Sequence, residues 1–171
     1  MSEQNIEIID DGETVAYYKD GLYHREDGPA LVTMEGFEHW YLNGKRHRIG
    51  GPAITMPGFG EEWWEDGVLH REGGPAVDHK KGDGKEGTKL WYHRGELHRK
   101  DGPAKVYADG SEMWLYEGKL HRRDGPALIN TRDDVKKWFV SGQEMSEEEY
   151  ILWRHKEEKF MRNKSARSTI G

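Results

Sequence analysis

The chain has 171 residues and a mass of 19.8 kDa, the size of one ordinary domain. Leu, Ile, Val and Phe supply only 29 residues, but the formal net charge is a modest −6 and the chain contains seven Trp and eight Tyr. Each large aromatic side chain can bury about 150–250 Å², so we expect a folded protein whose core depends on aromatic burial. The 22 glycines indicate a chain that turns often.

The composition also excludes several classes of protein. The absence of cysteine excludes disulfides, thiolate metal sites and cysteine nucleophiles, and it fits a reducing cytoplasm. No run approaches 18 apolar residues, and the first residues lack the pattern of a signal peptide. We therefore expect a cytoplasmic protein with no membrane partner. The acidic charge balance argues against a nucleic-acid partner.

In chain order, the dominant feature is a repeated segment that first appears as GLYHREDGPA at residues 21–30. Close variants begin at Gly44, Gly67, Gly95 and Gly118. The histidines of the five segments are separated by 23, 23, 28 and 23 residues, and the long interval reflects an insertion at 78–88. A sixth, degenerate unit contains Trp138 and Gly142. This regularity predicts a repeat protein of five to six units over residues 1–145.

Each unit has the pattern of a β-hairpin. An aromatic-rich run such as Trp40-Tyr41 precedes Asn43-Gly44, a dipeptide typical of a type I′ turn. The residues after each motif proline, which has no amide donor, form a second strand. We therefore predict two strands per repeat in an antiparallel meander. Because both turn positions need a positive φ, Asn43→Pro or Gly44→Val should disrupt the second hairpin.

The turn positions also fix a register. With Asn43-Gly44 as the loop, Tyr41 faces Arg46 and Trp40 faces His47. The same count predicts a structural ladder of aromatic–histidine pairs on one face, made by Trp40 and His47, Trp63 and His70, Trp91 and His98, and Trp114 and His121. The opposite face carries pairs such as Leu115 with Leu120, and we expect it to form the core.

The C-terminal segment has a different character. Ser146 and Glu149 form a capping-box pattern, which predicts a helix over residues 146–162 that covers the open end of the sheet. Residues 163–171 are basic, and we expect a flexible tail there. The predicted fold class is thus an all-β repeat, an elongated antiparallel β-hairpin array with a C-terminal capping helix.

The pattern W-Y-x-x-G-x-x-H-R-x-D-G-P-A resembles the divergent MORN-type repeats of uncharacterised bacteriophage and giant-virus proteins. The resemblance covers about residues 11–145. It implies an elongated hairpin array that is used mostly for contact with other proteins. If the viral likeness is informative, it implies a viral protein that binds and inhibits a host defence protein in the host cytoplasm.

The repeated His-Arg pairs have both a structural and a chemical interpretation. Histidine is a common metal ligand and general base, but a catalytic site is normally single. A histidine that recurs in every repeat is explained more simply by a structural role than by catalysis. We therefore predict no enzyme activity, no catalytic residues, no metal site and no cofactor. The arginines can pair with Asp27, Asp101 and Asp124 or with turn carbonyls, or they can form a basic stripe.

Two sets of cations are the candidate binding residues. One is the arginine ladder, formed by Arg25, Arg48, Arg71, Arg99 and Arg122, and the other lies in the insertion, at Lys80, Lys81 and Lys85. The preferred function is a non-enzymatic protein-binding module, with homodimerisation an open possibility. The alternative is a protein that sequesters a nucleotide or other anionic small ligand on the arginine ladder.

Overall fold

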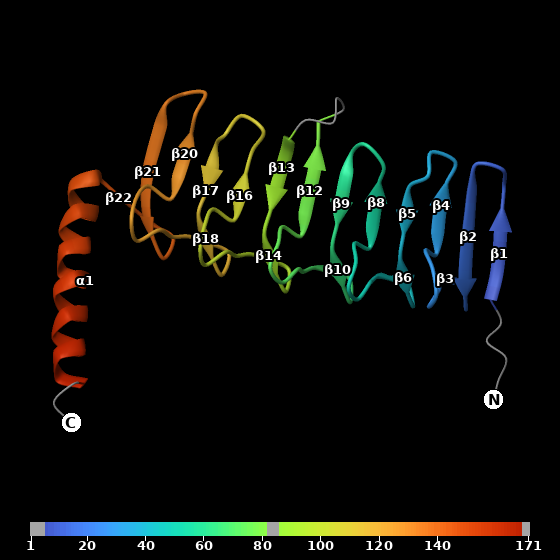
Figure 1. Cartoon of the computed structure of the whole chain (residues 1–171), viewed down its shortest axis with the longest axis horizontal. Coiled ribbons are helices and arrows are strands. Elements are labelled where there is room, and N and C mark those ends of the chain that lie inside the picture. Colours follow the sequence, from blue (N-terminus) through green and yellow to red (C-terminus); the bar gives the residue numbers. More distant parts are fainter. Residues whose placement is uncertain (1–5, 82–85, 169–171) are drawn as a thin grey trace.

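The structure, a computed structural model, describes residues 6–81 and 86–168. It confirms the predicted fold class, because antiparallel hairpins stack side by side in one long sheet and a single helix lies at the C-terminal end (Figure 1). The main sheet has the order β1 Ile6–Asp10, β2 Thr14–Lys19, β4 Leu31–Thr33, β5 Glu38–His39, β8 Ile54–Met56, β9 Gly60–Glu62, β12 Val77–Lys80, β13 Glu86–Leu90, β16 Lys105–Val106, β17 Glu112–Met113, β20 Leu128–Asn130, β21 Val135–Val140 and β22 Gln143–Met145, with β3 Leu22–Tyr23 paired to β2.

Four further two-stranded hairpins, which we call the short hairpins, lie along the lower edge of the main sheet in Figure 1. They are β6 Tyr41–Leu42 with β7 Lys45–Arg46, β10 Trp64–Glu65 with β11 Val68–Leu69, β14 Tyr92–His93 with β15 Glu96–Leu97, and β18 Leu115–Tyr116 with β19 Lys119–Leu120. Each of these repeats therefore contributes four short strands, whereas the sequence predicted two. The two-strand prediction was wrong because the chain breaks its pairing at the motif tryptophan.

Trp40 shows how this break arises. Its backbone N–H donates to the carbonyl of Ala53 in the main sheet (2.7 Å), and its own carbonyl accepts from the N–H of His47 in the short hairpin (3.1 Å). The residue thus bonds to two different partner segments. The same pair of bonds recurs at Trp63, Trp91 and Trp114.

The turns and the register of the short hairpins are as predicted. Asn43 and Gly44 have φ values of 48° and 76°, as a type I′ turn requires. Tyr41 pairs with Arg46, and Leu115 pairs with Leu120. The dipeptide alone therefore fixes which side chains share a face.

The core is thin. Among the described residues no large side chain is fully buried, whereas the alanines of the five Gly-Pro-Ala segments are each 0% exposed, at Ala30, Ala53, Ala76, Ala104 and Ala127. Ile54, Val77 and Leu115 are also buried, so the face that carries Leu115 does contribute to the core. The core therefore consists mainly of small side chains buried in every repeat, rather than of a central cluster of large side chains.

The two ends of the insertion belong to strands of the main sheet. Residues 78–80 and 86–88 belong to β12 and β13, whose pairing shifts register between Asp78 and Lys80. The described residues of the insertion therefore extend two paired strands of the main sheet. Lys85 lies outside the described residues.

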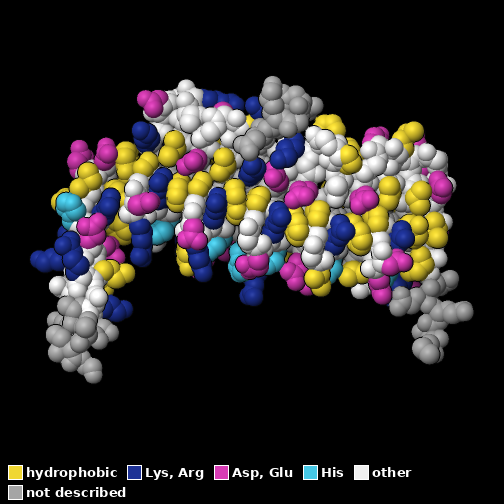
Figure 2. Space-filling model, in the orientation of Figure 1, with side chains coloured by type: hydrophobic (Ala, Val, Ile, Leu, Met, Phe, Trp, Pro, Cys, Tyr) yellow, Lys and Arg dark blue, Asp and Glu magenta, His cyan; other side chains and the backbone are white. Residues whose placement is uncertain are grey.

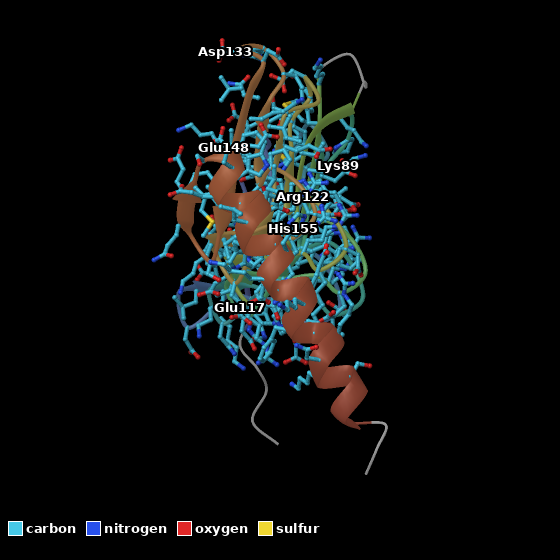
Figure 3. The ribbon with its side chains drawn as sticks, turned by 90° about the vertical axis from the view of Figure 1, so that its left-hand side faces the viewer. Lys89, Glu117, Arg122, Asp133, Glu148 and His155 are labelled. Atoms are coloured by element: carbon cyan, nitrogen blue, oxygen red, sulfur yellow. The ribbon has the colours of Figure 1, made fainter. Side chains whose placement is uncertain are left out.

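The helix α1 spans Glu147–Ser168 and runs across the end of the array (Figure 3). The capping box is formed as predicted: the Ser146 N–H donates to Glu149 Oε2 (2.9 Å) and the Glu149 N–H to Ser146 Oγ (3.2 Å). Tyr150 is buried, but Phe160 is 63% exposed, so the first turns make the contact. The helix passes the predicted end at 162, which makes most of the predicted tail helical. No helix in the described part of the chain has the length and apolar character needed to cross a membrane.

Candidate binding surface

The ladder arginines lie against the motif aromatic rings. The guanidinium carbon is 3.8–4.2 Å from the centroid of the ring in each repeat, pairing Arg25 with Tyr17, Arg48 with Trp40, Arg71 with Trp63, Arg99 with Trp91, and Arg122 with Trp114. Such cation–π contacts stabilise both groups. Figure 2 shows hydrophobic and basic side chains alternating along the length of the array.

The other side of each guanidinium packs on the Gly-Pro-Ala segment. A Cβ atom built on Gly51 would lie 2.8 Å from Arg48 Nε, and equivalent collisions occur at Gly28 and Gly102. The Arg48 Nη1 also donates to the Pro52 carbonyl at 3.1 Å, a bond that recurs in the other four repeats at 3.1–3.5 Å. The glycine is needed because the arginine occupies the space of its side chain.

Carboxylates complete some of these arginine sites. Arg25 Nε is 2.9 Å from Asp27 and Arg122 Nε is 2.7 Å from Asp124, as the sequence suggested. The hydrogen bond from Arg25, together with its charge, lowers the pKa of Asp27. Arg71 uses Glu61 instead, at 3.2 Å. The ladder arginines are thus structural groups with internal partners, rather than a free basic stripe.

The ladder histidines link each repeat to the next. In every case Nδ1 accepts a 3.1 Å hydrogen bond from the first turn residue of the following hairpin, pairing His24 with Asn43, His47 with Asp66, His70 with Arg94, His98 with Glu117, and His121 with Ser141. A nitrogen that accepts from a backbone N–H carries no proton. The neutral ring therefore has its proton on Nε2. In His24 this nitrogen is buried and has no hydrogen-bond partner among the described residues.

The backbone pairs each ladder histidine with its motif tryptophan, as the register predicted, but the two rings pack against different groups. The tryptophan rings contact the arginines, and several histidine rings lie beside side chains of the next repeat. His70 lies 5.0 Å from His93, and His98 lies 4.6 Å from Tyr116, between ring centroids. The inter-repeat hydrogen bond turns the imidazole toward its neighbour, an effect that pairing within one hairpin does not predict.

One cluster has the residue types of a metal site. His70, Glu72 and His93 bring a ligand atom each within 4.8 Å of one another. However, Nδ1 of His70 accepts the Arg94 N–H, so its Nε2 carries the proton and lies 3.7 Å from the Glu72 carboxylate. A protonated nitrogen cannot ligate a metal. The arrangement is that of a histidine facing a carboxylate.

The lysines of the insertion do not form a common site. Lys80 Nζ is 3.2 Å from its near neighbour Asp78, and Lys81 is exposed at the end of β12. Neither residue is brought to the arginine ladder in the contacts of the described residues.

The residue that follows each His-Arg pair was not among the predicted site residues. This position is exposed in all five repeats, where it is occupied by Glu26, Ile49, Glu72, Lys100 and Arg123, and we call these residues the variable row. Ile49 is 81% exposed and the Glu72 side chain 78%. Alignment of the repeats contains the missing signal, because this position changes in charge while the preceding His-Arg pair recurs in every repeat.

Two concavities lie beside the variable row. One, of about 610 Å³, is lined by Arg71, Glu72, Trp91 and His93 among others. The next, of about 740 Å³, lies one repeat further on between Arg99, Lys100, Tyr116 and Arg123. They are equivalent spaces between successive His-Arg loops, and the variable row decides their charge.

Two comparisons with known proteins were negative. The sequence matches no protein-family model, and no curated protein matches it significantly. The hairpin array and its candidate surface therefore stand on the structure alone, and the resemblance to MORN-type repeats stays a prediction.

Proposed function

We propose that this chain is a non-enzymatic protein-binding module whose scaffold presents the variable row to a partner. One observation supports this above all. The His-Arg pair that recurs in every repeat has partners inside the scaffold, whereas the variable row, which changes in charge, is exposed at equivalent positions along the array. Repeat proteins commonly bind through such extended surfaces.

The arrangement of histidine and arginine supports a structural rather than a catalytic role. Each ladder histidine uses Nδ1 to bond to the next repeat, so it cannot act as a base there without breaking that bond. The identity of the partner as a host defence protein rests only on the viral resemblance.

The proposal is tested by capturing partners with the tagged full chain in lysate of the natural or host cell. The matched bait changes three exposed residues of the variable row together, as Glu26→Lys, Ile49→Asp and Glu72→Lys. We expect one stoichiometric protein on the wild-type bait and its loss from the variant. Failure to capture any stoichiometric protein on a folded wild-type bait would contradict the proposal.

A further inference from the structure

The variable row changes sign along the array. It is acidic in the first and third repeats, at Glu26 and Glu72, apolar in the second, at Ile49, and basic in the fourth and fifth, at Lys100 and Arg123. All five side chains are exposed. Because the scaffold around them repeats, the environment of one position can be compared directly with that of the next.

In the acidic repeats the chain places its own carboxylate beside the histidine donor. Glu26 Oε1 lies 3.6 Å from His24 Nε2, and Glu72 Oε1 lies 3.7 Å from His70 Nε2. Glu72 also lies 3.3 Å from His93 Nδ1, on the neighbouring repeat. Glu65 Oε2 is also 3.8 Å from His70 Nε2. The fold thus places a carboxylate of the variable row beside the histidine in two repeats, and in the third repeat this carboxylate also reaches the next repeat.

The fourth and fifth repeats have the same donors and the opposite charge. Within residues 6–81 and 86–168, no carboxylate pairs with the imidazole of His98 or His121. Lys100 and Arg123 stand at the positions where Glu26 and Glu72 supply the carboxylate. A carboxylate from outside the chain would complete the pattern there.

The space beside these residues is the 740 Å³ concavity, which we call the basic cleft. It is lined by Arg99, Lys100, Tyr116, His121, Arg122 and Arg123, with Asp101 and Asp124 as its acidic residues. Asp124 already pairs with Arg122, so the cleft is cationic in a chain whose net charge is −6. A second concavity, lined by Lys119 and Arg123 and by the acidic Glu117, adjoins it along the array.

We propose that the basic cleft binds the carboxylates of an acidic peptide segment on a partner protein. This inference rests on the proposed protein-binding function and deepens it. Lys100 and Arg123 line the basic cleft, and Lys119 and Arg123 line the adjoining concavity. The cations are therefore distributed over two neighbouring concavities, which suits several carboxylates in series better than one phosphate group. The half-exposed ring of Tyr116 provides an apolar surface between them.

The test measures binding of a fluorescein-labelled hexaglutamate peptide to the full chain by fluorescence anisotropy at low salt. The variant K100E/R123E introduces the residues that the first and third repeats carry at these positions, so it should fold. The matched control K136E/K156E makes the same charge change at exposed positions on β21 and α1. We expect K100E/R123E to weaken binding about tenfold or more and the control to change it less than about threefold.

Three results would overturn the assignment: no binding by folded wild-type protein, equal weakening by both variants, or stronger binding of pyrophosphate that displaces the peptide. Either of the first two results would show that the cleft does not bind an acidic peptide. The third would show that the cleft binds a free oxyanion instead. The lysate capture described above is scored independently. A captured partner that K100E/R123E still binds would preserve the protein-binding function while rejecting this site.

Discussion

At the scale of single residues, the recurring motif H-R-x-x-G-P-A is a set of interlocking contacts. The histidine accepts a hydrogen bond from the next hairpin, and the arginine lies on an aromatic ring and donates to the proline carbonyl. The glycine leaves space for the arginine, and the alanine is fully buried. Each recurring residue of the motif therefore has a structural role, and recurrence alone is no evidence that a residue binds a partner.

The pairing of glycine with arginine predicts a specific coupling. In Gly51→Ala the new methyl group would displace the Arg48 guanidinium from Trp40 and from the Pro52 carbonyl. We expect the free energy of unfolding to fall by about 1–3 kcal/mol, the value of one cation–π contact and one hydrogen bond. Urea denaturation monitored by tryptophan fluorescence measures this loss.

A double-mutant cycle is the control for that prediction. Once Arg48→Ala has removed the guanidinium, Gly51→Ala should cost less than about 0.5 kcal/mol, because nothing remains to be displaced. Strictly additive losses in the double variant would show that the alanine acts on the backbone rather than through Arg48.

At the scale of elements, the sequence predicted the turns and the register but not the strand boundaries. Asn43-Gly44 imposes a positive φ at both positions, and this local requirement is visible in the dipeptide. The break at Trp40 is set by hydrogen bonds to Ala53 and His47, which belong to different hairpins. The strand propensities of Trp40 and its neighbours carry no information about these two hydrogen-bond partners. The sequence therefore predicted a continuous strand through Trp40.

The short hairpins depend on their neighbours for stability. Strands of two residues are too short to be stable alone, yet each hairpin receives three bonds from the preceding repeat. Asn43 N–H donates to His24 Nδ1, Gly44 N–H donates to the Tyr23 carbonyl, and the Tyr41 carbonyl accepts from Arg25 N–H. The turn is therefore both a chain reversal and an inter-repeat contact.

Two substitutions at Asn43 distinguish the backbone roles of this residue, in the chain reversal and in the inter-repeat hydrogen bond, from the contribution of its side chain. Asn43→Pro removes the N–H that bonds to His24 and cannot adopt the φ of 48°. We expect it to destabilise the protein by about 2–4 kcal/mol, whereas Asn43→Gly, which retains the N–H and the positive φ, should cost less than about 1 kcal/mol. Thermal unfolding of the two variants distinguishes them, and a proline variant as stable as the glycine variant would refute the register.

At the scale of the whole molecule, the repetition of the scaffold explains why the candidate surface was missed. The sequence directed attention to the arginine ladder, because those residues recur. In the structure Arg25 and Arg122 have internal carboxylate and carbonyl partners, while the exposed variable row differs from repeat to repeat. Which side of each motif faces solvent depends on stacking between repeats, and a single repeat does not contain that information.

The interface between the fifth repeat and the degenerate sixth unit uses Nδ1 of His121 as the acceptor of the Ser141 N–H, so acid should weaken this interface. Burial, aided by Arg123, lowers the pKa of His121, and burial, aided by Arg46, lowers the pKa of His39. The unfolded chain then binds more protons than the folded one once the pH falls below about 6.5. The free energy of unfolding should be greatest above that pH and decrease as the pH falls through the lowered pKa values.

Urea denaturation between pH 8 and pH 5 measures this decrease, and the range ends above the region where the carboxylates of Asp27 and Asp109 titrate. His121→Asn is the informative variant, because Oδ1 can accept the Ser141 N–H in place of Nδ1 but does not titrate. It should match the wild type at pH 8 and lose less stability at pH 5. An unchanged pH dependence in this variant would show that protonation of His121 does not weaken its interface.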